Sequence, residues 1–105
     1  MAYIANYSET ALDRAEIDAL PGEVLIEFGV DWCPHCQCAQ SFIAGALQTK
    51  PDLRHIKVED GAGRRLGRSF RVKLWPTLIL MREGQEVGRI VRPTSEGEVA
   101  DLLAG

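Results

Sequence analysis

The stretch that most constrains the fold is residues 23–38, EVLIEFGVDWCPHCQC, where a compact apolar run is followed at once by three cysteines. The run holds one acid, Glu27, among branched and aromatic residues, which predicts a buried strand. Pro34, directly after Cys33, suits the first turn of a helix because its missing N–H has no helical acceptor there. The sequence therefore predicts a buried strand that ends close to Cys33, at the N-terminus of a helix.

The rest of the chain predicts an alternation of helices and strands. We expect helices at residues 8–20, 34–49, 61–72 and 94–105, and strands at residues 23–30, 53–59, 76–81 and 82–91. Ser8 is a candidate cap of the first helix, and Thr94 or Ser95 of the last, with Glu98 in reach of a capping box. A further strand at residues 3–6 would be the fifth. The order predicts an α/β fold, with a central mixed β-sheet of 4–5 strands and helices on both faces.

Length, charge and cysteine usage narrow the class of protein. A chain of 105 residues predicts a single domain, 1–105, and a net charge of −3 favours neither nucleic acid nor an anionic membrane. No apolar run approaches the roughly 20 residues of a membrane span, and the N-terminus does not look like a signal peptide. Three clustered cysteines are typical of a reducing compartment. We expect a cytoplasmic monomer.

The first two cysteines are placed for thiol chemistry. Unpaired N–H groups and the helix dipole favour an anion at Cys33, and the thiolate is the nucleophile. Cys36 lies three residues on, so it shares a helix face with Cys33 and is near enough to bridge. A helix turns by about 100° per residue, which places Cys38 roughly opposite Cys36. We expect Cys38 to face the protein body as a small buried side chain.

These segments together resemble the thioredoxin family. VLIEFGVDWCPHC is similar to the strand, tryptophan and Cys-x-x-Cys of that family, and WPTLIL with REGQEVGRIV is similar to its proline loop and closing hairpin. The resemblance implies a thioredoxin fold and a thiol–disulfide oxidoreductase that acts on cysteine-containing protein substrates without a cofactor. Cys33 would attack, and Cys36 would resolve the mixed disulfide.

The resemblance also implies the residues that line the substrate groove. Trp32 would cover the disulfide, and Pro34 would lie beside it. Pro76 matches a proline that is cis in the family and lies against the cysteines, so the backbone of Trp75 would offer hydrogen bonds to substrate. Arg92 falls near a glycine of the family's docking face, and it would change the charge of the groove.

Glu27 matches a buried acid that the family has beneath the cysteines. We expect burial to raise the pKa of Glu27 and the carboxylate to take the proton of Cys36 during resolution. An alternative is an edge carboxylate that reaches solvent. His55 falls near a position where the family often has a lysine close to that acid. We expect an exposed strand histidine, with a functional partnership with Glu27 as the alternative.

The dipeptide between the cysteines departs from the typical thioredoxin and resembles that of periplasmic disulfide oxidases. His35 can place a hydrogen bond or positive charge near Cys33, which would stabilise the reduced form and make the couple less reducing. Alternatively, His35 points into solvent with little influence. The electron donor would be a reductase or glutathione.

Two other classes of function remain open from the sequence. One is a metal-binding module that uses Cys33, His35, Cys36 and Cys38, and the other is a redox-silent interaction domain. The segment GAGRRLG is not a nucleotide-binding fingerprint, because Leu66 occupies the place of the third glycine. The basic residues around it predict a solvated helix face, or a docking site for an acidic protein: Arg64, Arg65, Arg68, Arg71 and Lys73.

Overall fold

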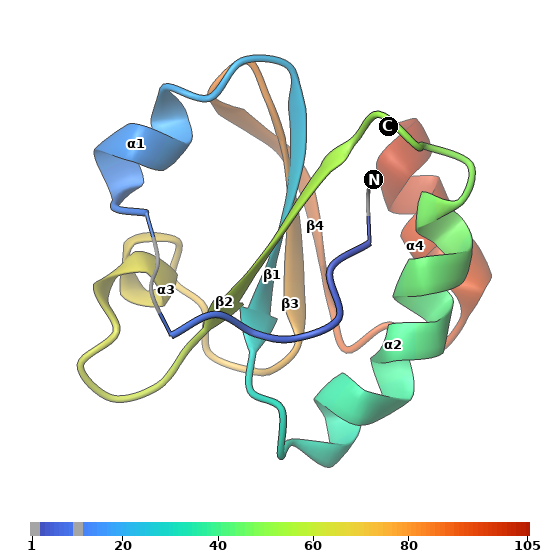
Figure 1. Ribbon diagram of the computed structural model, residues 1–105, viewed down its shortest axis with the longest axis horizontal. Helices are drawn as coiled ribbons and strands as arrows, with labels where there is room; N and C mark the ends of the chain where they lie inside the picture. Colours follow the sequence, from blue (N-terminus) through green and yellow to red (C-terminus); the bar gives the residue numbers. More distant parts are fainter. Residues whose placement is uncertain (1–2, 10–11) are drawn as a thin grey trace.

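The core of the protein is one four-stranded mixed sheet. The computed structural model describes residues 3–9 and 12–105. The strands are β1 (Glu23–Gly29), β2 (Arg54–Glu59), β3 (Thr77–Arg82) and β4 (Gln85–Val91), and their order in the sheet is β2-β1-β3-β4. β1 is parallel to β2 and antiparallel to β3, and β3 and β4 form an antiparallel hairpin (Figure 1). The predicted mixed sheet and closing hairpin are confirmed.

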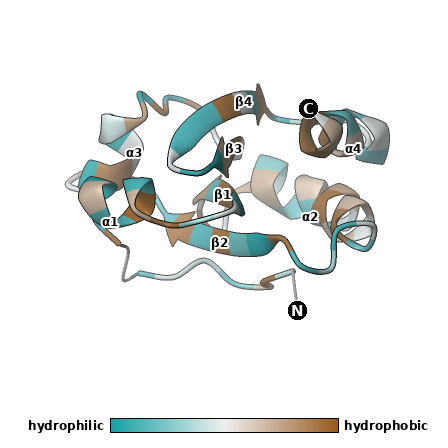
Figure 2. Cartoon of the chain, turned by 90° about the horizontal axis from the view of Figure 1, so that it is seen from above, coloured by the Kyte–Doolittle hydropathy of each residue, from teal (hydrophilic) through white to brown (hydrophobic). Residues whose placement is uncertain are grey.

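Helices cover both faces of this sheet, as predicted. α1 (Arg14–Asp18) and α3 (Arg65–Ser69) lie on one side, and α2 (Pro34–Leu47) and α4 (Glu96–Ala104) on the other (Figure 2). Each side has its own buried hydrophobic cluster. Side chains of a strand alternate between faces, so Leu25 packs in the cluster of α2 and α4, while Ile26 and Phe28 pack in the other. Position 27 therefore falls on the face that α2 covers.

The first helix begins later than the sequence predicts. Its cap is Asp13, which accepts a hydrogen bond from the Glu16 amide while the Glu16 side chain accepts one from the Asp13 amide. This reciprocal capping box starts the helix at Arg14, so the prediction of Ser8 as the cap is wrong. Residues 10 and 11 of the predicted helix lie outside the described residues.

The N-terminal segment follows the edge of the sheet without forming a strand. Residues 3–8 begin on the side of α2 and run past β2 towards the side of α1 and α3 (Figure 1), and Ser8 makes a single parallel bridge with Val58. The Ser8 amide donates to the Lys57 carbonyl over 3.0 Å, and the Glu59 amide donates to the Ser8 carbonyl over 2.9 Å. The backbone of the described segment thus pairs with the backbone of β2 around Ser8.

The predicted helices at residues 61–72 and 94–105 begin later in the structure than the sequence predicts. Gly61 and Gly63 have φ angles of 142° and 79°, which a helix does not allow, so α3 begins only at Arg65. Ser95 caps α4 by accepting a hydrogen bond from the Glu98 amide over 3.2 Å. The Glu98 carboxylate accepts bonds from the Thr94 amide and hydroxyl instead of from Ser95, so the predicted capping box is incomplete.

Candidate active site

The end of β1 and the start of α2 place Cys33 and Cys36 next to each other. Cys33 is the N-cap residue of α2, and Pro34 occupies its first turn. Both cysteines are buried, with 6% and 1% of their surface exposed, and both are free thiols. They form a small apolar cluster with Tyr7 and Val30, against which Trp75 packs. The structure therefore presents a dithiol at a helix N-terminus.

Two tryptophans flank this dithiol. Trp32 is 72% exposed and meets the ring of Trp75 edge-on, with centroids 6.1 Å apart. The Trp75–Pro76 peptide bond is cis, and Pro76 is buried. The indole of Trp75 donates a hydrogen bond to Asp60 over 2.8 Å, which holds the ring in place. Trp32 and Trp75 thus lie together beside the dithiol, and Pro76 follows Trp75 directly.

Arg92 reaches the same place from the loop after β4. Its backbone is left-handed, with a φ of 52°, and its amide donates to the Pro76 carbonyl over 2.9 Å. Its Nε donates to the Trp75 carbonyl, also over 2.9 Å. The sequence predicts that the backbone of Trp75 offers hydrogen bonds to substrate, and its carbonyl already accepts this one from Arg92.

Pro34 and His35 lie on the solvent side of the first turn of α2. Both residues are exposed. Within residues 3–9 and 12–105, no hydrogen bond links His35 to Cys33. Any influence of His35 on the Cys33 thiolate therefore acts through charge near the helix terminus and not through a fixed contact.

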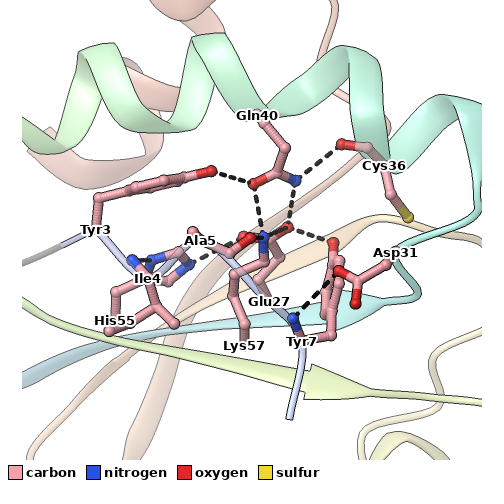
Figure 3. A network of polar contacts seen from close by, with 10 residues as sticks. All are labelled: Tyr3, Ile4, Ala5, Tyr7, Glu27, Asp31, Cys36, Gln40, His55 and Lys57. Carbon is pink, nitrogen blue, oxygen red and sulfur yellow. Dashed lines mark hydrogen bonds and ion pairs between the residues drawn. The ribbon is translucent and has the colours of Figure 1, made fainter.

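Behind Cys36 lies a buried carboxylate with four donor groups around it. Glu27 is 0% exposed. Its Oε2 accepts hydrogen bonds from the Tyr7 hydroxyl and, over 2.8 Å, from the Gln40 amide, and lies 3.9 Å from the Lys57 ammonium. Its Oε1 lies 2.9 Å from Nε2 of His55 (Figure 3). The alternative of an edge carboxylate in solvent is wrong.

His55 is buried and not exposed as predicted, with 4% of its surface accessible. In the parallel pair of β1 and β2, Leu25 lies opposite His55 and Glu27 opposite Lys57, so both β2 side chains face α2. The Ile4 amide donates to Nδ1 over 2.9 Å. Since Nδ1 accepts, Nε2 carries a proton and donates to Glu27, while the Lys57 ammonium lies on the other carboxylate oxygen.

These partners lower the pKa of Glu27, where the sequence predicts a raised one. Burial alone would raise this pKa, but the hydrogen bond from His55, the charge of Lys57 and the hydrogen bond from Tyr7 together outweigh it. The prediction fails because it considered the apolar neighbours on β1 and not the donors from other segments. Glu27 is therefore ionised at neutral pH.

Cys36 has the opposite shift. Burial and the adjacent Cys33 raise the pKa of the Cys36 thiol to about 11, although its interactions with the Val30 backbone and with Tyr7 act in the other direction. The thiol is protonated at neutral pH. The Cys36 thiol must lose its proton before it can act as a nucleophile. The ionised carboxylate of Glu27 nearby can act as the base.

Cys38 is exposed, so the prediction that it faces the protein body is wrong. The prediction put Cys38 opposite Cys36 on the side of the protein body, whereas the buried face of α2 begins with Cys36 and continues through Ala39 and Ile43. Two residues after Cys36, Cys38 lies on the opposite, solvent side of the helix. It does not converge with Cys33 and Cys36, and the described residues hold no group of three or more His, Cys, Asp or Glu suited to a metal ion.

Three members of the site are missing from the sequence prediction: Tyr7, Gln40 and Lys57. The period of two along β2 points to Lys57, because it shares a face with His55. Gln40 lies one helical turn after Cys36, and its side chain also donates to the Cys36 carbonyl over 2.8 Å. Nothing in the local sequence signals Tyr7, which reaches the site from the other side of β2.

Comparisons with known proteins agree on one family. The sequence model of the family Thioredoxin matches residues 6–104. The structure of thioredoxin 2 from Pseudomonas aeruginosa in its reduced form is 49% identical, with a TM-score of 0.85 over 96% of this chain and 98% of that one. Thioredoxin from Chlamydia trachomatis is 33% identical over 83 residues, which are 79% of this chain and 81% of that protein.

Other curated relatives are longer than the matched region. The chain is 36% identical over 84 residues to protein disulfide-isomerase A3 of Gallus gallus, covering 78% of this chain and 17% of that protein. It covers 65% of mitochondrial thioredoxin-3 of Saccharomyces cerevisiae, at 29% identity over 83 residues. In the part of the chain that the structure describes, no helix has the length and apolar character to span a membrane. The fold, the dithiol and the match across residues 6–104 lead to one conclusion: the chain belongs to the thioredoxin family.

Proposed function

We propose that this protein is a thiol–disulfide oxidoreductase that acts on disulfides of protein substrates through Cys33 and Cys36. The observation that carries the proposal is the dithiol at the N-terminus of α2, with an ionised carboxylate behind its second cysteine. In the first step, the Cys33 thiolate attacks one sulfur of a substrate disulfide. A mixed disulfide forms, and the other substrate sulfur leaves as a thiolate.

In the second step, Cys36 loses its proton and attacks Sγ of Cys33. The mixed disulfide breaks, the Cys33–Cys36 disulfide forms, and the second substrate sulfur leaves as a thiolate that takes a proton from solvent. Two electrons pass from the dithiol to the substrate. The roles of Cys33 and Cys36 differ because Cys33 is the N-cap of α2 and Cys36 lies deeper, against Tyr7 and Val30.

The substrate groove runs over Trp32, Pro34, Trp75 and Pro76. Supporting this, Trp32 is the most exposed large apolar residue beside the dithiol, and Trp75 packs against the cysteine cluster. An extended substrate segment would pair with the backbone of Trp75, with Arg92 beside its carbonyl. The groove accepts a peptide, and no cofactor is needed for the exchange.

We propose further that the Cys33–Cys36 couple is less reducing than that of a typical thioredoxin, because His35 places partial positive charge near the Cys33 thiolate. The test is the redox equilibrium of the Cys38→Ser protein in glutathione buffers, followed by tryptophan fluorescence. His35→Gly is the matched comparison. We expect the His35→Gly couple to be more reducing, since the reduced form loses its stabilisation.

An unchanged equilibrium in His35→Gly would show that His35 points into solvent without influence. The absence of a reversible two-electron couple in either protein would overturn the oxidoreductase itself. The electron donor we propose is a reductase or glutathione in a reducing, cytoplasmic setting, and the chain works as a monomer. Turnover of a protein disulfide with each donor in separate assays identifies which one reduces the couple.

A further inference from the structure

The Tyr7 hydroxyl lies between the carboxylate of Glu27 and the sulfur of Cys36. It donates a hydrogen bond to Oε2 of Glu27, and Tyr7 packs in the same buried cluster as Cys36 (Figure 3). The Gly29 position shows how close the two groups are. A Cβ at Gly29 would lie 2.6 Å from the Cys36 sulfur and 2.6 Å from the Tyr7 hydroxyl. Both atoms therefore pack against the backbone of Gly29.

We propose that Tyr7 is a catalytic residue that relays the proton of Cys36 to Glu27 in the resolving step. The proposal rests on the thiol–disulfide exchange proposed above. It gives the buried carboxylate a defined path to the thiol, because no hydrogen bond among residues 3–9 and 12–105 joins Glu27 directly to the Cys36 side chain. Tyr7 donates to Glu27 and packs against the Cys36 side chain. Gln40 also donates to Glu27, but of Cys36 it reaches only the backbone carbonyl.

The hydrogen-bond directions around Glu27 determine which way the proton can move. The amide of Gln40, Nε2 of His55 and the hydroxyl of Tyr7 all donate to the carboxylate. Gln40 cannot be turned around, because its Oε1 accepts from Tyr3 over 2.7 Å and from Lys57 over 2.8 Å. The Tyr7 proton therefore points at Glu27, and the lone pairs of the Tyr7 oxygen are left to accept the Cys36 proton.

The relay balances as two coupled transfers. The Cys36 S–H gives its proton to the Tyr7 oxygen while the Tyr7 O–H gives its own proton to Oε2 of Glu27. Tyr7 ends as it began, Glu27 is protonated, and the Cys36 thiolate attacks Sγ of Cys33 and displaces the substrate thiolate. When the disulfide is later reduced, the path runs backwards: Glu27 first takes up a proton from the solvent side and then passes it through Tyr7 to Cys36.

The acid–base character of the three groups fits this order. Burial, the charge of Glu27 and its hydrogen bond raise the pKa of Tyr7 far above the ordinary range, so the tyrosine passes a proton without remaining a phenolate. Burial is the largest cause of the raised pKa of Cys36, and the hydrogen bond and charge of Cys33 raise this pKa further. In the mixed disulfide Cys33 is neutral and has no thiol, so the Cys36 proton is easier to remove at that stage.

A pocket next to Tyr7 gives the relay access to solvent. It encloses about 410 Å³ and is lined by Tyr7, Cys36, Gln40 and Lys57 together with residues of the 5–7 and 30–31 segments. A proton left on Glu27 after resolution can return to bulk water through this side. The relay is thus sheltered from the substrate groove but not isolated from water.

Tyr7→Phe in the Cys38→Ser background tests the relay, because it removes the hydroxyl and keeps the ring. The reduced protein reacts with dithiobis(nitrobenzoate) in a stopped-flow mixer. The first nitrothiophenolate reports attack by Cys33, and the second reports resolution by Cys36. We expect an unchanged first phase and a second phase at least about tenfold slower at neutral pH, from the usual scale of acid–base catalysis. The difference in second-phase rate between Tyr7→Phe and the protein with Tyr7 should shrink as the pH rises, because hydroxide can then remove the Cys36 proton in place of the relay.

Tyr3→Phe is the matched control, since it removes a hydroxyl that reaches Gln40 but neither Glu27 nor Cys36. It should leave both phases and their pH profiles unchanged. Glu27→Gln combined with Tyr7→Phe should slow resolution no more than the slower single variant, because both break one path.

The outcomes separate the relay from the exchange reaction. If the second phase of Tyr7→Phe keeps its rate and pH profile, the relay is wrong and the exchange stands. Additive losses in the double variant would equally contradict a single path. If the unmodified protein releases neither nitrothiophenolate, the oxidoreductase proposal fails first and the relay fails with it.

Discussion

At the scale of single residues, Glu27 shows how neighbours from other segments decide the state of a buried acid. Its pKa is lowered in the folded protein, so the folded state binds fewer protons than the unfolded chain in the acidic range. The resulting stability is present above the ordinary glutamate pKa of about 4.3, and it is lost as the pH falls through the folded pKa.

Glu27→Gln tests this directly. The change leaves the buried Lys57 ammonium without its carboxylate, which lies 3.9 Å away, and should lower the free energy of unfolding by about 3 kcal/mol at pH 7. Urea unfolding at several pH values measures it. The gap to the unmodified protein should begin to narrow as the pH falls below about 4.3, where the unfolded chain takes up the proton first, and it should close only once the pH is below the lowered pKa of folded Glu27. Glu86→Gln, at a surface pair with Arg89, should cost less than about 1 kcal/mol. A gap that stays constant across this range would contradict the lowered pKa.

Cys38 gives a second prediction at this scale. Because the thiol is exposed while Cys33 and Cys36 are buried, it is free to form a disulfide between two molecules under oxidising conditions. We expect Cys38→Ser to abolish a disulfide-linked dimer on non-reducing gels and to leave the glutathione equilibrium of the Cys33–Cys36 pair unchanged. A dimer that persists in Cys38→Ser would place the reactive thiol in the active site instead.

At the scale of elements, the segment around α3 has a strongly uneven charge. Residues 61–75 contain five cations and no acid, in a chain of net charge −3. Arg64, Arg68 and Lys73 line a pocket of about 330 Å³ together with one acid, Asp60, and with Trp75, so three cations against one carboxylate lie beside the proposed substrate groove. Such an arrangement favours a substrate with acidic residues beside its disulfide.

Reversing charge at this pocket should therefore change substrate preference. For Arg68→Glu with Lys73→Glu, we expect KM to rise several-fold for a peptide disulfide flanked by acids, with kcat unchanged. For a neutral peptide, KM should stay the same. Arg54→Glu is the control, because Arg54 starts β2 at the end of the sheet away from Cys33. The difference should fade at high salt, where surface charges are screened. Equal changes in KM for the acidic and the neutral peptide would contradict a preference for acidic substrates.

At the scale of the whole molecule, the site is assembled from four separate parts of the chain. Tyr7 comes from the N-terminal segment, Glu27 from β1, Gln40 from α2, and His55 and Lys57 from β2. The N-terminal segment also supplies the Ala5 carbonyl, which accepts from Lys57 over 2.6 Å. The buried ion pair therefore depends on residues that belong to no helix or strand.

Removing residues 1–8 should destabilise the protein beyond the loss of local contacts. Burial of Tyr7 alone accounts for about 2 kcal/mol, and Lys57 and His55 lose their partners as well. We expect a lower midpoint of urea unfolding and a resolving phase slowed as in Tyr7→Phe. An unchanged midpoint would mean that the segment contributes nothing to the native state.

The sequence predicts most of the fold because its signals are local. The apolar runs of β1 and β3, the proline of α2 and the turn before β4 each mark an element without reference to the rest. The dithiol and the acid on β1 follow from the same stretch. His55, Lys57 and Tyr7 do not, since their burial depends on which strands pair and on how residues 3–8 cross the edge of β2. The orientation of α2 likewise decides that Cys36 is buried and Cys38 exposed.

The close approach at Gly29 has an evolutionary consequence. Any side chain at position 29 would collide with the Tyr7 hydroxyl and with the Cys36 sulfur. The cysteine is needed for the dithiol, so a larger residue at position 29 requires both that the sulfur shift and that the tyrosine be absent. Relatives that place a larger residue at position 29 should therefore have lost the tyrosine at position 7, and relatives that keep the tyrosine should keep the glycine. Positions 7 and 29, far apart in the chain, are expected to covary as a pair across the family.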